Sequence, residues 1–205
     1  GENRFYYITT MNENYLQPEM PEGAEEGIIK GMYRLRRSDH SGELRVQLLG
    51  AGTILREVEA AALILEQDYG VAADVWSLTS VNELQREGKT VQRWNMLHPE
   101  EPARVPYITG LLQEESGPFV AATDYIKSYT DQIREFIPGD FTVLGTDGYG
   151  RSDTRGTGCP QGVGRSGAYG NITGECGDGC AGDSGRQSRP DYPLKIRKSL
   201  WQNNR

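Results

Sequence analysis

The sequence has few cysteines, no long apolar run and no leader-like start. Its three cysteines, Cys159, Cys176 and Cys180, are an odd number confined to the last quarter of the 205 residues, which favours a reducing compartment over a disulfide framework. No apolar run approaches the roughly 20 residues that span a bilayer, and GENRFYYITT lacks the charged start and apolar centre of a signal peptide. We therefore predict a cytoplasmic protein with no membrane partner. Because it begins with Gly rather than Met, we also expect a fragment.

The chain is short of positive charge as well. It carries 22 Lys and Arg against 29 Asp and Glu, which gives a formal charge of −7. Nucleic acids and anionic membranes are bound through clustered Lys and Arg, so this balance argues against nucleic acid as a partner. A hydrophobic fraction of 36% is enough for one buried core of ordinary domain size.

The composition changes near Asp153. Residues 1–153 hold 14 Lys and Arg against 25 Asp and Glu, whereas residues 154–205 hold 8 against 4, so the net charge changes sign. The thirty residues 156–185 contain 11 of the 26 glycines and almost no apolar periodicity, and such a stretch cannot offset the entropy of ordering. We divide the chain into an interdomain linker with the end of a preceding domain (1–24), one domain (25–153) and an irregular Gly-rich tail (154–205).

The main body alternates apolar strands with amphipathic helices. Residues 45–49, 74–78, 118–122 and 141–144 are short apolar runs typical of strands. The first strand precedes a Gly50-Ala51-Gly52 turn and a helix, and the second precedes a helix that Thr79 or Ser80 can cap. The third precedes a predicted helix over 124–137, which Thr123 or Asp124 opens and Pro138-Gly139 stops. The apolar positions of the three predicted helices are Ile54, Val58, Ala61, Ala62 and Leu65, then Val81 and Leu84, then Tyr125, Tyr129, Ile133 and Phe136.

Strands separated by helices of this length require crossover connections and a mostly parallel sheet that is covered on both faces. We therefore predict an α/β fold with a doubly wound sheet. Residues 5–9 indicate one more strand, and the polar, proline-containing stretch after it has no period until Ile28, which is typical of a linker.

Several strings of this body resemble one enzyme family. They are TTMNENY, MPEGAEEGI, VQLLGAGTILREV, DYGVAADVWSLTS, RWNMLHP, TDYIKSYTDQIREFIPGDFTVLGTDG and GYGRSD, and they run from about Phe5 to Arg155 with no gap larger than a loop. Together they resemble the homodimeric-type, thiamine-diphosphate-dependent first component of the pyruvate dehydrogenase complex.

The resemblance implies a transketolase-like enzyme of three α/β domains, in which the first two bind thiamine diphosphate and magnesium across a dimer interface. The whole enzyme would decarboxylate pyruvate and pass the acetyl unit to a lipoyl group on the dihydrolipoamide acetyltransferase core. The family's catalytic glutamate, histidines and diphosphate-metal motif lie upstream of the matched segment. We therefore predict no catalytic, cofactor-binding or metal residue here, no bound cofactor, and an isolated fragment that is inactive.

Three strings in the tail imitate functional motifs. Residues 177–179 (GDG), followed 23 residues later by Asn203-Asn204, imitate the metal-diphosphate motif, but Pro190 and Pro193 interrupt the helix that this motif needs. Residues 180–185 (CAGDSG) imitate a serine-protease nucleophile segment without the surrounding all-β fold. The three cysteines lack a fourth zinc ligand nearby.

Three further features lie in the body. Residues 50–53 (GAGT), between a strand and a helix, could present backbone N–H groups to a phosphate, but Leu55 takes the place of a third glycine and we favour a tight strand-to-helix turn. His98, which precedes Pro99, is more typical of a structural residue than of an acid or base. Residues 147–153 follow the last strand, where functional loops gather, and we expect them to pack against a neighbouring domain or subunit.

The resemblance stops within a few residues of Arg155. Because every Gly codon is GGN and every Cys codon is TGY, the segment from Gly174 can be read one base later without the DNA. That reading permits a run of Ala, Val, Thr and Leu, similar to the alanine-rich closing helix of the family. We hypothesise a frameshift near Arg155, and a genuine Gly-rich disordered tail is the alternative.

Two functional hypotheses follow. The first is a carboxy-terminal piece of the pyruvate dehydrogenase component that supports domain packing and dimerisation. The second is a free-standing, non-catalytic binding or docking module derived from the same domain.

Overall fold

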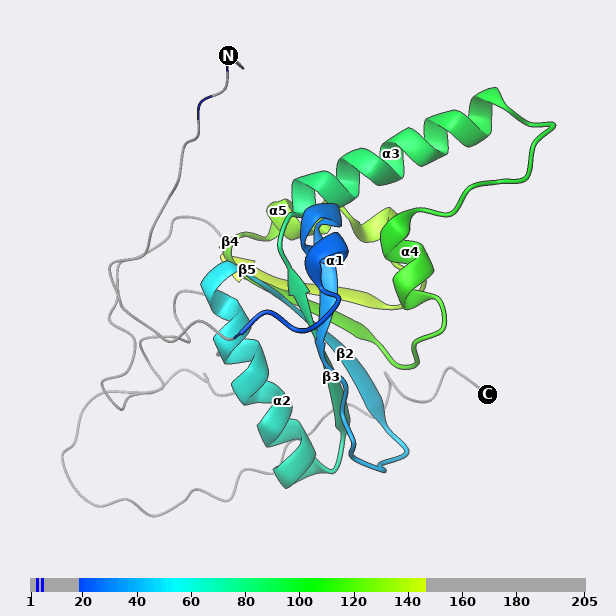
Figure 1. The fold of residues 1–205 in the computed structure, drawn as a ribbon. Coiled ribbons are helices and arrows are strands. Elements are labelled where there is room, and N and C mark those ends of the chain that lie inside the picture. Colours follow the sequence, from blue (N-terminus) through cyan, green and yellow to red (C-terminus); the bar gives the residue numbers. More distant parts are fainter. Residues whose placement is uncertain (1–2, 4, 6–18, 147–205) are drawn as a thin grey trace, which may run out of the picture.

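The computed structural model describes residues 3, 5 and 19–146, and Figure 1 shows how their elements are arranged. The helices are α1 (Glu25–Lys30), α2 (Leu55–Tyr69), α3 (Val81–Leu97), α4 (Tyr107–Leu112) and α5 (Lys127–Asp131), with 3-10 turns η1 (Gly52–Ile54) and η2 (Arg134–Phe136). The strands are β1 (Met32–Arg36), β2 (Arg45–Ala51), β3 (Ala72–Leu78), β4 (Phe119–Ile126) and β5 (Phe141–Thr146).

These strands form one sheet in the order β1-β3-β2-β4-β5. The four strands β3, β2, β4 and β5 are parallel, and β1 pairs with β3 in the antiparallel direction at one edge. The predicted doubly wound, mostly parallel α/β fold is confirmed.

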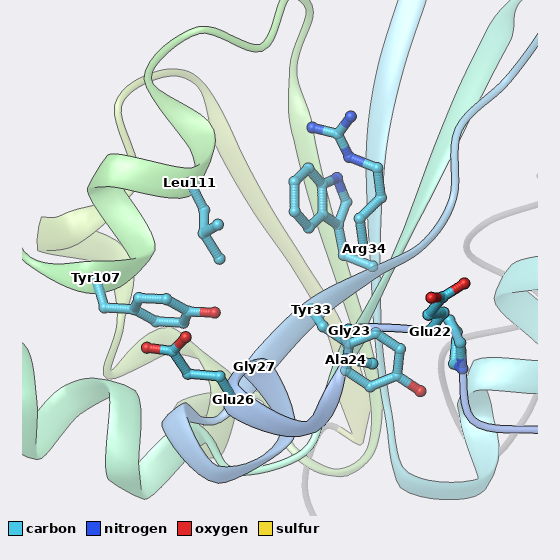
Figure 2. Close-up of a pocket in the computed structure, with 11 residues that line it drawn as sticks. Glu22, Gly23, Ala24, Glu26, Gly27, Tyr33, Arg34, Tyr107 and Leu111 are labelled. Carbon is cyan, nitrogen blue, oxygen red and sulfur yellow. The ribbon is translucent and has the colours of Figure 1, made fainter.

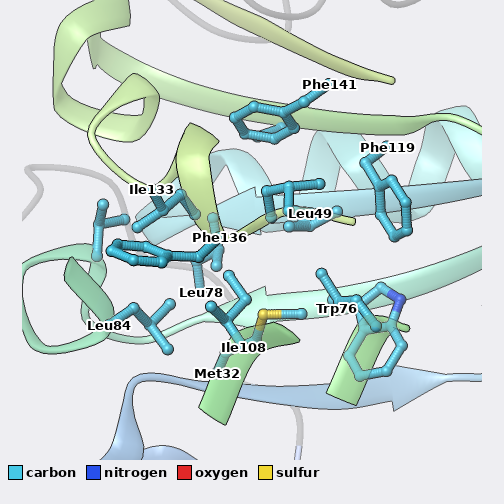
Figure 3. Packing of buried hydrophobic residues seen from close by; sticks show 14 of the residues in the cluster. Met32, Leu49, Trp76, Leu78, Leu84, Ile108, Phe119, Ile133, Phe136 and Phe141 are labelled. Carbon is cyan, nitrogen blue, oxygen red and sulfur yellow. The ribbon is translucent and has the colours of Figure 1, made fainter. Parts of the chain in front are cut away.

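The central strands are buried on both faces because each face has its own core. Along β2, Val46 and Leu48 pack on the side of α2, while Leu49 and Ala51 pack on the side of α3 and α4. The larger cluster, on the α3 side, contains Trp76, Phe119 and Phe141 from strands β3, β4 and β5 and Phe136 from the 3-10 turn η2 (Figure 3). Continuous apolar runs, rather than strict alternation, are what a sheet covered on both faces requires.

The helix boundaries follow from local chemistry. The side chain of Ser80 accepts a hydrogen bond from the Glu83 N–H (3.2 Å), which confirms the predicted cap of α3. Gly70 ends α2 with a φ of +64°, a left-handed conformation that favours glycine.

The four predicted body strands are confirmed, but the predicted continuous helix over 124–137 is wrong. Strand β4 continues to Ile126, which pairs with Thr146 of β5, and the Thr146 hydroxyl donates to the Asp124 carbonyl (2.9 Å). Only α5 and η2 follow, so Tyr125 lies on the strand. Pairing with a neighbouring strand overrides the helical spacing of this segment.

Three elements were not predicted: α1, β1 and α4. Each of the two helices has six residues and lacks a side-chain cap, and β1 is a five-residue edge strand. Too short for a periodic pattern, they form through contacts with the rest of the domain. The predicted strand over 5–9 lies outside the described residues apart from Phe5, and the tail 154–205 lies wholly outside them.

A buried carboxylate joins the amino ends of the strands. Asp74 of β3 is fully buried and accepts hydrogen bonds from the Ser38 N–H (2.8 Å), the Arg45 guanidinium (2.7 Å) and the Gln47 amide (3.0 Å). Gln47 also donates to the Ser116 carbonyl (3.1 Å). Burial by itself raises the pKa of Asp74, but these donors and the charge of Arg45 outweigh it and hold the pKa below its usual range.

We expect Asp74→Asn to lower the free energy of unfolding by about 2–4 kcal/mol at pH 7, because the Arg45 charge loses its buried partner. The native carboxylate has a depressed pKa, so its contribution is complete above the unfolded pKa of about 3.9 and is lost as the pH falls through the folded value. The difference in free energy of unfolding between wild type and variant, measured by urea unfolding, should therefore become smaller below about pH 4. Glu26→Gln, which breaks an exposed pair with Lys30, is the control and should change the free energy of unfolding far less than Asp74→Asn does.

Gly88 and Gly110 form a matched pair inside helices. A Cβ on Gly88 of α3 would lie 2.5 Å from the Phe136 ring, which is buried, whereas a Cβ on Gly110 of α4 would meet nothing within 4 Å. We expect Gly88→Ala to destabilise the chain by about 1–3 kcal/mol. Gly110→Ala should stabilise it by up to about 1 kcal/mol through helix propensity. Thermal unfolding measures both, and equal effects at the two positions would contradict the packing of α3 on Phe136.

Candidate functional site

A cleft of about 510 Å³ lies between residues 21–27, which include the start of α1, and the face of the sheet on which α4 packs (Figure 2). Pro21, Glu22, Gly23, Ala24, Glu26 and Gly27 form one wall, and Tyr33, Arg34, Trp76, Tyr107 and Leu111 form the other. Aromatic rings, two carboxylates and one guanidinium therefore face a shared space.

Arg34 of β1 is the central cation of the cleft. Its guanidinium carbon lies 4.5 Å from the centre of the Trp76 ring, and the same guanidinium pairs with the Glu115 carboxylate. The indole N–H of Trp76 donates to Gln47 (2.8 Å), so the cleft is connected to the Asp74 network beneath it. A cation held between an aromatic face and a carboxylate is a stable, pre-arranged group.

Tyr107 closes the other side of the cleft. Its hydroxyl donates to the Met32 carbonyl (3.0 Å), its backbone N–H donates to Glu87 (3.0 Å), and the Lys30 ammonium lies 4.8 Å from its ring centre. Burial raises the pKa of Tyr107, so the phenol stays protonated at neutral pH. On the α1 side of the cleft, a Cβ on Gly27 would lie 2.7 Å from the Cβ of Tyr33. This close approach explains why position 27 is a glycine.

The cleft offers binding groups rather than a catalytic set. Arg34 is paired with Glu115 and Glu26 with Lys30 (2.6 Å), so neither group is positioned as a base or nucleophile. Within residues 3, 5 and 19–146, no group of three or more His, Cys, Asp or Glu could hold a metal ion. These residues do not fit the magnesium that the family resemblance implies for the diphosphate.

The GAGT segment at the carboxyl end of β2 is a packing turn. Gly50 and Ala51 belong to the strand, and a Cβ on Gly50 would lie 2.8 Å from the Leu55 backbone. Gly52 has a φ of +61° and starts η1. The close approach and the left-handed residue account for both glycines without a phosphate.

His98 takes part in a stack at the end of α3. Its ring lies 4.5 Å from the Trp94 ring, nearly parallel to it, and its Nδ1 lies 2.8 Å from the Trp94 carbonyl oxygen. This supports the structural interpretation of His98. The loop 147–153, the GDG and CAGDSG strings and the three cysteines lie outside the described residues.

Comparison with known families decides the relationship. The model of the transketolase-like TK C-terminal domain matches residues 31–159, which include all five strands of the sheet. The chain belongs to this family. The match overlaps the domain that the composition predicts over 25–153, whose bounds remain a prediction.

Individual relatives are similar to about three quarters of the chain. The pyruvate dehydrogenase E1 component of Pseudomonas aeruginosa is 57% identical over 152 residues, which are 74% of this chain and 17% of that protein. The protein of the same name from Escherichia coli K12 is 57% identical over 155 residues, which are 75% and 17%. That of Cupriavidus necator is 52% identical over the same shares. The chain thus spans about a sixth of the length of these relatives.

Among solved structures, transketolase from Campylobacter jejuni is 20% identical with a TM-score of 0.38, covering 60% of this chain and 15% of its own. A likeness this low carries no argument about function. In the part of the chain that the structure describes, no helix is long and apolar enough to cross a membrane.

We expect Arg34→Met to lower the free energy of unfolding by about 1–3 kcal/mol, because Glu115 is only 11% exposed and would lose its partner. The double variant with Glu115→Gln removes the unpaired charge and should recover part of that loss. A double-mutant cycle by urea unfolding measures the coupling. Strictly additive effects would show that the ion pair between Arg34 and Glu115 does not stabilise the folded chain.

Proposed function

We propose that the chain provides the carboxy-terminal, transketolase-like domain of a pyruvate dehydrogenase E1 component. The observation that carries the proposal is the 57% identity to E1 components over about three quarters of the chain. The complete enzyme would be an oxidoreductase that decarboxylates pyruvate and acetylates the lipoyl group of the dihydrolipoamide acetyltransferase core.

In this proposal the chain's contribution is structural. Thiamine diphosphate with magnesium would supply the electron sink for decarboxylation and would be held by other domains of the enzyme. The residues described here would bind and orient those domains and support the homodimer. Consistent with this role, two charged groups of the cleft are held in ion pairs, Glu26 with Lys30 and Arg34 with Glu115. We propose that the chain by itself binds no thiamine diphosphate and is inactive.

A chimera tests the proposal directly. In the P. aeruginosa E1 component, the 152 matched residues are replaced by those of this chain, which share 57% identity. We expect the chimera to remain a homodimer and to oxidise pyruvate in the assembled complex at a rate within about tenfold of the parent, which corresponds to an activation barrier raised by at most about 1.4 kcal/mol. Its control carries Trp76→Asp, which places a charge in the core and should abolish assembly.

Two results would contradict the proposal. The first is a folded, dimeric chimera without activity, which would show that this domain no longer supports the enzyme. The second is thiamine diphosphate binding by the 205-residue chain alone, measured by titration calorimetry. A chain that is monodisperse and binds neither cofactor nor E1 domains would favour the free-standing module.

A further inference from the structure

The sequence has two histidines, and the structure gives their Nδ1 atoms opposite hydrogen-bond roles. His40 lies in the loop between β1 and β2, where its Nδ1 accepts a hydrogen bond from the Gly42 N–H (3.0 Å). His98 ends α3, and its Nδ1 lies 2.8 Å from the Trp94 carbonyl oxygen. A neutral imidazole carries a proton on one ring nitrogen and accepts with the other. The proton of neutral His40 is therefore on Nε2, and that of His98 is on Nδ1.

The loop around His40 is anchored at Ser38. This residue is buried, and its N–H donates to the Asp74 carboxylate (2.8 Å) while its hydroxyl donates to Glu66 of α2. The His40 N–H in turn donates to the Ser38 hydroxyl (3.2 Å). The backbone of His40 is thus held against the Asp74 network, and the chain folds back so that Gly42 reaches its ring.

Gly42 is confined between this ring and the end of α2. A Cβ on Gly42 would lie 2.4 Å from the Gly70 carbonyl oxygen and 3.0 Å from the Nδ1 of His40. The Gly42 backbone is half-buried, and a buried N–H that loses its acceptor costs free energy. The hydrogen bond to Nδ1 therefore helps to keep this part of the loop closed against α2.

We infer that residues 40–42, which we call the His40 turn, form a pH-sensitive contact that closes with a neutral ring and opens when the ring gains a second proton. A protonated imidazole donates from both nitrogens, so its Nδ1 can no longer accept from the Gly42 N–H. Histidine ordinarily changes charge between about pH 5 and pH 8, so the turn opens as the pH falls through this range. The contact of His98 survives the same change, because its Nδ1 already donates.

The charges around the His40 turn give a protonated ring other partners. Asp39 and Glu43 flank the turn as exposed carboxylates, and either can attract a charged ring away from Gly42. The other charged or titratable groups of the adjoining elements are held in ion pairs, as are Arg36 with Glu66 and Arg45 with Asp74, or are exposed, as are Arg37, Asp68 and Tyr69.

Opening of the His40 turn leaves its anchor in place. Burial raises the pKa of Glu66, but the hydrogen bonds from Ser38 and Arg36 outweigh this effect and hold the pKa below its usual range. Because the pKa of Asp74 is also depressed, through its donors and despite burial, both carboxylates stay ionised at about pH 5. Ser38 therefore remains bound, and the response to pH is confined to the loop.

Solvent exchange of the Gly42 amide tests the inference, measured by NMR on the 205-residue chain and corrected for the intrinsic effect of pH. We expect its protection to be at least about fivefold lower at pH 5 than at pH 8, as the loss of one hydrogen bond requires. At pH 8 the ring nitrogens should show an Nε2–H in His40 and an Nδ1–H in His98.

His40→Asn is the matched control, because its side-chain oxygen can accept the same N–H two residues along and does not titrate. Gly42 should stay protected at both pH values in this variant and at neither in His40→Ala. Equal protection of the wild type at pH 5 and pH 8 would overturn the inference, and so would an Nδ1–H on His40 at pH 8. A loss of protection in His40→Asn as large as in the wild type would also overturn it, because another group would then be responsible.

Discussion

The carboxylate of Asp74 is the contact on which the rest of the domain depends. It accepts from the loop after β1 through Ser38 and from β2 through Arg45 and Gln47. Gln47 uses its remaining amide hydrogen for the Ser116 carbonyl, next to β4, and its oxygen for the Trp76 indole. A buried charge is tolerated only when its hydrogen bonds are complete, so this one group fixes the positions of several segments at once. The same network also holds the Trp76 ring, because the indole N–H donates to Gln47. Arg34 stacks on this ring, so the network positions part of the cleft.

The sequence predicted the fold correctly where a long apolar run was bounded by turn or cap residues. The strands predicted at 45–49 and 74–78 lie within the observed β2 and β3, and the helices after them follow from periodicity and the Ser80 cap. The segment 124–137 was mispredicted because its apolar residues fit a helix and a strand-plus-turn equally well. Pairing of Ile126 with Thr146, a contact between distant residues, decides between them. No local signal predicts such a contact, nor the six-residue α1 and α4.

The cleft could not be predicted for a related reason. Its walls come from α1, β1, β3 and α4, and two of these helices have no periodic signature. Arg34 and Glu115 are 81 positions apart, so their pairing is visible only in the folded chain. By contrast, the structural role of His98 could be anticipated, because it depends on Trp94 one helical turn away. Family membership, which needs no geometry, was the part of the functional argument that the sequence carried furthest.

Gly88 determines more than the fit of α3 against Phe136. With no side chain between helix and ring, α3 rests close to the core at this point and leaves it soon afterwards. Past the contacts with Glu135, the last turns of α3 are held by the returning loop, through the stack of Arg104 on Trp94 and the two hydrogen bonds between Asn95 and Arg104. The end of the helix and this loop therefore form one stiff projection. A change in the angle of the helix at Gly88 would be carried undiminished to its tip.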